Sequence, residues 1–254
     1  MNVTSPVEYR VVDKIAYIRL NRPETANALD LDLALALCAA AQAAGGDESV
    51  HLVTLTAAGG RFCAGGDLAA MAADGDTGKY VYKLATAVDT FTKMLWEMPK
   101  PVLASVQGVA AGAGLALVLA ADLVVASRDA RFLAAYGAVN LTPDCGLSYL
   151  LPRSVGEHRA LEMTLLDRVL TADEAGEWGI VTMVCDNAEL AATTDALARR
   201  LLARSSFALG NTKRLIRQGW EQTRVDSGWA ETASIARAAA TPEAADAITA
   251  LFQR

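Results

Sequence analysis

The sequence predicts an α/β core that occupies roughly the first 185 of its 254 residues, followed by a helical C-terminal part. Two observations lead to this fold class. Short apolar runs with strand character alternate with alanine- and leucine-rich helical stretches along the core. From about Ala188 onward the strand signals disappear and alanine-rich helical patterns continue, with expected breaks near Ser205, Gly219, Gly228 and Pro242.

The individual elements follow from local signals. The pair Asp13-Lys14 is turn-like, lies between two apolar runs and predicts a hairpin. Asp30 is placed to cap a helix that Gly45-Gly46 would stop, and Pro99 follows the end of a longer helix. In chain order the expected elements are a hairpin (11–18), a helix (31–44), a strand (52–56), a helix (80–97), a strand (101–106), a short apolar helix (113–120), two strands (123–125 and 132–133) and two helices (147–151 and 157–166).

Composition excludes several classes of function. The formal net charge is −6, so the chain lacks the basic surface that nucleic-acid binding requires. The 4 cysteines form no CxxC pair and the 2 histidines lie far apart, so no metal site is expected. The apolar run from Val109 to Ala121 is shorter than a bilayer crossing, and no secretory leader opens the chain. We therefore expect a cytoplasmic protein with reduced cysteines and no membrane or nucleic-acid partner.

Two glycine-rich loops each lie between a predicted buried strand and a predicted helix: GGRFCAGGDL (59–68) and GVAAGAGL (108–115). Such turns expose free backbone N–H groups, and two of them side by side could donate to one developing oxyanion. The simpler interpretation is that the glycines only permit tight turns and close packing. The chain has no GxGxxG, GK[ST] or GxSxG motif in these loops, which disfavours dinucleotide binding, a P-loop and an α/β-hydrolase.

These loops, in this order, resemble those of the crotonase superfamily, also called the enoyl-CoA hydratase/isomerase family. Further colinear segments carry the resemblance: NRPETANAL (21–29), AADLVVAS (120–127), LTPDCGLSYLLPRSVG (141–156) and LTADEAGEWGIV (170–181). The resemblance implies a crotonase (ClpP/crotonase-like) fold. A spiral of ββα units over residues 1–190 would bind the acyl-CoA and catalyse its reaction. The helical region 191–254 would be a trimerisation region that assembles a homotrimer or a dimer of trimers.

The resemblance also implies roles for individual residues. The backbone N–H groups of Gly66 and Ala113 would hold the thioester oxygen of an acyl-CoA and stabilise its enolate. The CoA would lie against backbone near Ala26, Ala64, Asp67 and Leu68. Asp67 could instead cap the helix that begins there. No further cofactor is expected, because coenzyme A is part of the substrate.

The catalytic carboxylates depart from the hydratase pattern of this family. Ala116 and Tyr136 stand where hydratases have two glutamates, and an alanine can neither accept nor donate a proton. Tyr136 could donate a hydrogen bond, but lining an acyl pocket is the favoured interpretation. Asp144 is the one acid left in a catalytic segment, at the position where isomerase-like members carry their base. A structural alternative is that Asp144 caps the helix at 147–151.

A single carboxylate suffices for a double-bond shift, so we expect an enoyl-CoA isomerase that uses Asp144. Hydration, and hydrolysis or dehalogenation of an acyl-CoA through Asp144, are alternatives within the same family. A third alternative is a catalytically weak acyl-CoA-binding protein that has kept the fold. Neither Cys63 nor Cys145 has a histidine nearby in sequence, so a thiolate nucleophile is not expected.

Overall fold

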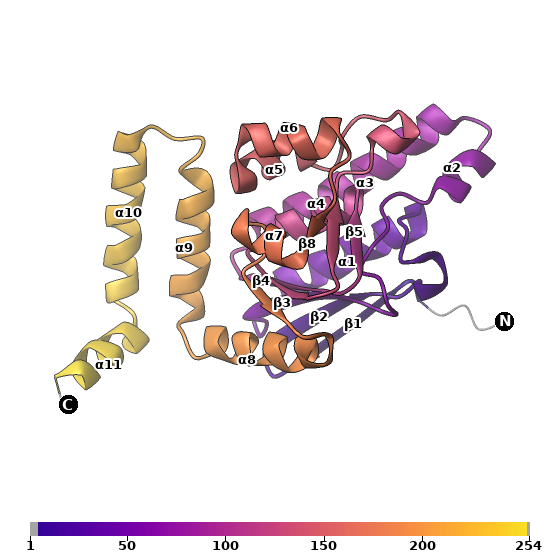
Figure 1. Ribbon diagram of the computed structural model, residues 1–254. Helices are drawn as coiled ribbons and strands as arrows, with labels where there is room; N and C mark the ends of the chain where they lie inside the picture. Colours follow the sequence, from indigo (N-terminus) through magenta and orange to yellow (C-terminus); the bar gives the residue numbers. More distant parts are fainter. Residues whose placement is uncertain (1–4, 253–254) are drawn as a thin grey trace.

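The computed structural model describes residues 5–252 (Figure 1). Its strands are β1 (Val7–Val12), β2 (Ile15–Leu20), β3 (Leu52–Ala57), β4 (Val102–Val106), β5 (Val109–Ala111), β6 (Leu123–Ser127), β7 (Arg131–Leu133), β8 (Leu170–Thr171) and β9 (Met183–Cys185). Its α-helices are α1 (Leu31–Gly46), α2 (Leu68–Ala73), α3 (Thr77–Glu97), α4 (Ala113–Ala120), α5 (Leu147–Val155), α6 (Glu157–Leu165), α7 (Ala172–Glu177), α8 (Leu190–Leu202), α9 (Ser206–Gln218), α10 (Arg224–Ala239) and α11 (Pro242–Leu251). Each predicted element is therefore present, with its ends shifted by a few residues at most.

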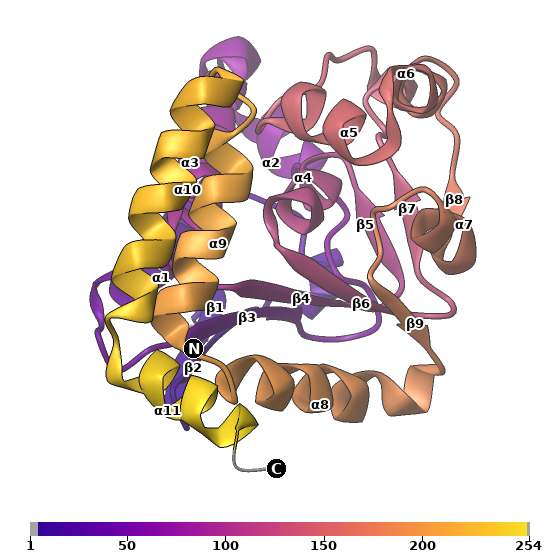
Figure 2. The same ribbon diagram turned by 90° about the vertical axis from the view of Figure 1, so that its left-hand side faces the viewer.

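The strands form two sheets. The larger sheet has the order β1-β2-β3-β4-β6-β9, in which β1 and β2 are antiparallel and the remaining neighbours are parallel. The smaller sheet has the order β5-β7-β8. In Figure 2 its strands run across the direction of the larger sheet. The chain passes between the two sheets at Gly108, so the second glycine loop lies where β4 of one sheet leads into β5 of the other.

Local signals explain several element boundaries. Asp13 and Lys14 adopt φ values of +48° and +68° in the tight turn of the β1–β2 hairpin, as the turn-like pair predicts. Asp30 caps α1 and accepts a hydrogen bond from the Leu33 N–H at 2.8 Å. Helix α1 ends at the predicted glycine pair, with Gly45 and Gly46 as its last two residues. A glycine at a helix end costs only about 1 kcal/mol relative to alanine, which the packing of α1 outweighs.

The breaks in the C-terminal part are confirmed at three of the four predicted places. Ser205 caps α9, Gly219 directly follows α9, and Pro242 is the first residue of α11. The break predicted at Gly228 is wrong, because Gly228 lies inside α10. Thr223 caps α10 and sets its start upstream of the glycine, which only lowers the helix propensity at that point.

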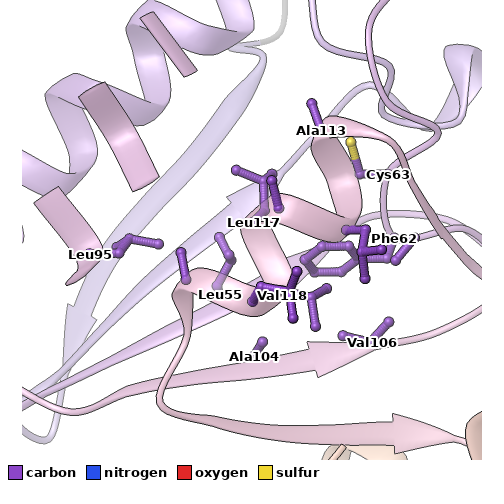
Figure 3. Close-up of a cluster of buried hydrophobic side chains, with 14 of the residues drawn as sticks. Leu55, Phe62, Cys63, Leu95, Ala104, Val106, Ala113, Leu117 and Val118 are labelled. Carbon is purple, nitrogen blue, oxygen red and sulfur yellow. The ribbon is translucent and has the colours of Figure 1, made fainter. Parts of the chain in front are cut away.

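Helix α4 is the centre of the hydrophobic core. All of its residues are buried, which is the behaviour of a helix that is apolar on every side. Figure 3 shows Leu117 and Val118 of α4 among side chains of the larger sheet and of the first glycine loop, including Leu55 and Phe62. The core therefore fixes the position of the α4 N-terminus, where Ala113 lies.

Helix α8 and helices α9 to α11 relate differently to the core. Leu197 and Ala198 of α8 pack on the larger sheet with Ile15, Leu52 and Leu103, so the first helix of the expected region 191–254 covers the sheet. Helices α9, α10 and α11 extend to one side of the sheets in Figure 1. Within residues 5–252, no helix combines the length and the hydropathy that crossing a bilayer requires.

Two cations of α9 hold that helix against the core. Lys213 Nζ donates to the Leu95 carbonyl oxygen at 2.7 Å, and Arg217 Nη2 donates to the Ala120 carbonyl oxygen at 3.2 Å. These carbonyls belong to the last turns of α3 and α4, where the helix dipole favours positive charge. Both cations also pair with Asp122, Lys213 at 2.9 Å and Arg217 at 2.5 Å. One carboxylate therefore compensates two buried cations.

We predict that Asp122→Asn destabilises the protein by about 3–5 kcal/mol, because it leaves buried cations without their counter-charge. Urea unfolding measures the loss, and hydrogen exchange should show α9 opening first. Asp186→Asn is the matched control, since Asp186 pairs with Arg128 on the exposed surface at 3.1 Å and should lose less than about 1 kcal/mol. Equally small losses in both variants would contradict the role given to Asp122.

Candidate active site

The two glycine loops lie against each other. The first loop runs beside β5: the Cys63 N–H donates to the Val109 carbonyl at 3.0 Å, and the Ala111 N–H donates to the Cys63 carbonyl at 3.0 Å. A Cβ atom on Gly114 would lie 2.8 Å from the Cys63 Cβ and still closer to the Cys63 carbonyl oxygen. Only glycine allows this approach of backbone to backbone. The glycine pattern therefore serves close packing and also brings the two turns together.

The direction of the Gly66 N–H follows from the hydrogen bonds of its neighbours. The Gly65 carbonyl accepts from the Leu29 N–H at 2.7 Å, and the Asp67 N–H donates to the Leu29 carbonyl at 2.9 Å. In a planar trans peptide the C=O and the following N–H point in opposite directions. Because the Gly65 carbonyl points to Leu29, the Gly66 N–H points away from Leu29.

The direction of the Ala113 N–H is likewise set by the hydrogen bonds of the preceding carbonyl. The Gly112 carbonyl accepts from the N–H groups of Leu115 and Ala116 at 3.0 and 3.2 Å, along the axis of α4. The Ala113 N–H therefore points out of the N-terminus of α4. Within the described chain, neither the Gly66 N–H nor the Ala113 N–H donates to a backbone carbonyl.

The turns that carry the two donors are in contact. A Cβ atom built on Gly112 would lie 3.8 Å from the Gly65 Cα, so the residues that precede the two donors touch each other. The dipole of the buried helix α4 adds positive potential at Ala113. This pair of N–H groups has the properties of an oxyanion hole: free donors, fixed by backbone hydrogen bonds before a ligand arrives.

Asp144 and Tyr136 form a hydrogen-bonded pair. The Tyr136 hydroxyl donates to Asp144 Oδ1 at 2.6 Å. Burial raises the pKa of Tyr136, and the negative charge of Asp144 raises it further, so the hydroxyl stays protonated and remains a donor. Of the two roles considered for Tyr136, the structure therefore shows the hydrogen bond.

The interpretation of Asp144 as a helix cap is wrong. The residue before α5 is Gly146, and no side chain caps this helix. Asp144 contributes only its backbone carbonyl, which accepts from the Leu147 N–H at 2.9 Å. Its carboxylate is turned instead to Tyr136, which follows the smaller sheet in the chain.

The Asp144 segment is held against the core next to the glycine loops. Thr92 of α3 donates its hydroxyl to the Cys145 carbonyl at 3.3 Å. The Cys145 side chain is buried in the same hydrophobic core as Cys63 and Ala113, and the Cys63 thiol contributes to the raised pKa of Cys145. The Asp144 segment is therefore anchored in the hydrophobic core that also contains Cys63 and Ala113.

The cysteines in this region are not activated. Burial raises the pKa of Cys63 to about 12, and burial together with the Asp144 charge raises the pKa of Cys145. Both thiols are protonated at neutral pH, and protonated thiols are poor nucleophiles. No group of three or more His, Cys, Asp or Glu side chains within residues 5–252 is arranged to hold a metal ion.

The residues expected to bind CoA lie in two places. Ala26 and Ala64 line a cavity of about 480 Å³ beside Arg61, and the Ala64 N–H donates to the Ala26 carbonyl at 3.1 Å. Asp67 caps α2, as the alternative interpretation proposed, and accepts from the N–H groups two and three residues further on, at 3.1 Å each. Leu68 opens α2 and is half exposed, outside the wall of that cavity.

Sequence reasoning missed two residues of this region. Arg22 pairs with Asp30 at 3.0 Å and with Asp67 at 3.1 Å. Arg22 lies in the NRPETANAL segment, which carries the family resemblance but does not by itself indicate which residues Arg22 pairs with. Thr92 holds the Asp144 segment from the middle of α3, and nothing in its local sequence distinguishes it from other helical threonines.

Comparison with known proteins places this geometry in a family. Residues 10–246 match the sequence model of the enoyl-CoA hydratase/isomerase family. The chain is 39% identical over 203 residues to the 1,2-epoxyphenylacetyl-CoA isomerase of Escherichia coli (strain K12), a match that covers 78% of this chain and 77% of that protein. It is 36% identical over 213 residues to the 4-chlorobenzoyl coenzyme A dehalogenase-2 of Arthrobacter sp, covering 83% and 77% of the two chains.

The fold agrees with the same family. The crystal structure of an enoyl-CoA hydratase/isomerase from Cupriavidus metallidurans CH34 superposes with a TM-score of 0.91 at 33% identity, over 100% of this chain and 95% of that one. The crotonase fold implied by the family resemblance is thereby confirmed. This protein belongs to the enoyl-CoA hydratase/isomerase family of the crotonase superfamily and is an acyl-CoA-processing enzyme.

Proposed function

We propose that this protein is an enoyl-CoA isomerase that moves a double bond through a thioester enolate. In this proposal Asp144 carries the proton, and the N–H groups of Gly66 and Ala113 hold the thioester oxygen. The main support is the Asp144 carboxylate, which accepts a hydrogen bond from Tyr136 at 2.6 Å while the neighbouring Cys145 is buried in the same hydrophobic core as Cys63 and Ala113. The similarity to the 1,2-epoxyphenylacetyl-CoA isomerase of Escherichia coli favours an isomerisation of a CoA thioester.

The proposed chemistry requires one base and one oxyanion hole. The Asp144 carboxylate removes a proton from C2 of a 3-enoyl thioester, and the C–H electron pair moves toward the carbonyl oxygen. The two N–H groups stabilise the negative charge that develops there. The carboxylic acid then returns the proton to C4 as the double bond shifts to C2–C3. No atom or electron is gained or lost overall, so the reaction needs no cofactor besides the CoA of its substrate.

Tyr136 would prepare Asp144 for this task. Its hydroxyl binds Oδ1 and orients the carboxylate, so that Oδ2 is the oxygen available to the substrate proton. Because the pKa of Tyr136 is raised, Tyr136 does not compete with Asp144 as an ionising group. We propose that the ring of Tyr136 also borders the acyl group.

The side chains at the hydratase positions support isomerisation over hydration. Ala116 is fully buried inside α4, and Tyr136 is a hydrogen-bond donor with a raised pKa. Hydration needs a base for the water and an acid that protonates the α-carbon, and these two positions supply no carboxylate. Direct attack by Asp144 on the acyl group would instead lead to the dehalogenase or hydrolase reaction, which product analysis separates from a double-bond shift.

The surroundings suggest where the CoA and further subunits bind. We propose that the CoA lies along Ala26 and Ala64, with Arg61 near its phosphates and with Asp67 and Leu68 at the edge of its path. We also propose a homotrimer or a dimer of trimers in the cytoplasm. Large apolar side chains on and around the last three helices are more than half exposed in the single chain, namely Ile216, Trp220, Val225, Trp229, Ile235, Ile248, Leu251 and Phe252.

We predict that Asp144→Asn lowers the kcat for a 3-enoyl-CoA by about 10²–10⁴-fold, the usual loss when a general base is removed. The KM should change little, because both N–H donors remain. The rise in ultraviolet absorbance of the conjugated product measures the reaction. Asp173→Asn is the matched control, since Asp173 pairs with Arg128 at 3.3 Å on the exposed surface. A natural rate in Asp144→Asn would overturn the assignment of the base.

We predict that the natural protein hydrates crotonyl-CoA at least about 100-fold more slowly than it isomerises a 3-enoyl-CoA, because the acid–base pair for water is missing. Mass spectrometry separates the hydrated product from the isomer, and 4-chlorobenzoyl-CoA in the same panel tests dehalogenation. Efficient hydration, or halide release faster than isomerisation, would replace the proposed reaction with the corresponding alternative.

We predict that sedimentation velocity finds a trimer or hexamer at micromolar concentration. A double variant with Trp229→Glu and Ile235→Glu should dissociate it, because both side chains are about 70% exposed in the single chain and would place charges in an apolar interface. A natural protein that sediments only as a monomer would contradict this assembly.

A further inference from the structure

Arg22 connects the N-termini of two helices through their capping aspartates. Its Nη1 pairs with Asp30 Oδ2 at 3.0 Å, and its Nη2 donates to Asp67 Oδ2 at 3.1 Å. Each aspartate uses its other oxygen as a helix cap, Asp30 Oδ1 for α1 and Asp67 Oδ1 for α2. The three side chains are mostly buried, with exposed fractions of 18% for Arg22, 22% for Asp30 and 12% for Asp67.

The two aspartates directly follow Leu29 and Gly66, the two residues at the backbone contact that orients the Gly66 N–H. Asp30 comes after Leu29, whose N–H and carbonyl make the hydrogen bonds on either side of Gly66. Asp67 comes after Gly66 itself and supplies one of those hydrogen bonds through its own N–H, at 2.9 Å. Arg22 thus holds together the two backbone segments whose contact determines where the Gly66 N–H points.

We propose that Arg22 is a positioning residue for the oxyanion donor at Gly66. This inference rests on the proposed function, in which the Gly66 N–H holds the thioester oxygen. Arg22 does not contact the thioester. It acts through Asp67 and Asp30, and the cavity assigned to CoA is lined by the residues after it and not by Arg22.

A guanidinium group is better suited than the ammonium group of a lysine to pair with two carboxylates at this position. Two nitrogens of one rigid plane reach two carboxylates, and Nη1 also donates to the Ala28 carbonyl at 2.6 Å. An ammonium group is a point charge on a flexible chain and would pair with one carboxylate at a time. The partial burial of the three side chains limits screening by solvent.

The test measures turnover of a 3-enoyl-CoA together with the infrared carbonyl band of bound butyryl-CoA labelled with ¹³C at C1. Butyryl-CoA has no double bond to shift, and hydrogen bonds to its thioester oxygen lower the carbonyl stretching frequency. Arg22→Gln should lower kcat by about 10- to 100-fold, because a misplacement of about 1 Å costs on this scale. Its KM should stay nearly constant, and the carbonyl band should move back toward its frequency in water.

Further variants separate positioning from a loss of folding. Asp67→Asn keeps an oxygen for the α2 cap while removing the charge that Arg22 holds. It should reproduce the kcat loss and the band shift. The double variant with Arg22→Gln should be little worse than either single variant, since the two residues act in one contact. Arg22→Lys should lie between Arg22→Gln and the natural protein. These variants carry the test if Arg22→Gln does not fold.

Control variants calibrate the expected changes. Arg19→Gln breaks an exposed ion pair with Glu8, 2.9 Å long, and should leave kcat and the carbonyl band unchanged. Gly66→Pro removes the donor itself and should cost about 10²–10³-fold in kcat. It is made together with Met71→Ala, because the Met71 methyl group occupies the space of a side chain at position 66. Met71→Ala alone is the reference.

The outcomes for the two proposals are distinguishable. A natural protein that neither isomerises the substrate nor shifts the carbonyl band contradicts the proposed function, whatever Arg22 does. A natural protein that does both, with Arg22→Gln and Asp67→Asn unchanged in kcat and band position, overturns the role of Arg22. A raised KM with unchanged kcat in Arg22→Gln also overturns it, because Arg22 would then bind CoA directly.

Discussion

The planar trans peptide is the constraint on which this site depends. A backbone N–H cannot be aimed by a rotamer, so its direction must be set by what the adjoining carbonyl binds. Here the Gly65 carbonyl is bound by the Leu29 N–H, and the Gly112 carbonyl is bound by the first turn of α4. Both donors are consequently oriented by hydrogen bonds on the far side of their peptide planes. The two N–H groups are therefore oriented without any ligand, which is the condition that the proposed oxyanion hole requires for strong electrostatic stabilisation.

Burial of α4 gives this arrangement its rigidity. The helix is surrounded by the core on all sides, so its N-terminus has no freedom to shift without disturbing close packing. Gly114 allows the Cys63 backbone to lie directly on that helix, which ties the first glycine loop to the second. This contact determines both the packing and the positions of the donors, because Gly114 permits the close approach and thereby brings the two donor turns together.

The reacting side chains are held more locally than the donors. Asp144 receives one hydrogen bond from Tyr136, and its segment receives another from Thr92 of α3. The relatives of this chain include an isomerase and a dehalogenase that are both named for CoA substrates. In the proposed function, the side chains near the thioester select the reaction. Alanine and tyrosine occupy the hydratase positions, and the proposal therefore assigns the proton transfer to Asp144.

The sequence by itself determined the features that depend on near neighbours. The α4 boundaries, the β1–β2 turn and the caps at Asp30 and Asp67 are all encoded within a few residues. Only the tertiary structure decided which distant groups meet. Tyr136 donates a hydrogen bond to Asp144, and Arg22 joins Asp30 to Asp67. The physical reason is the separation of the interacting residues along the sequence. Caps and turns are set by hydrogen bonds between residues that are close in the chain. Ion pairs and core contacts between remote segments form only when the chain has packed.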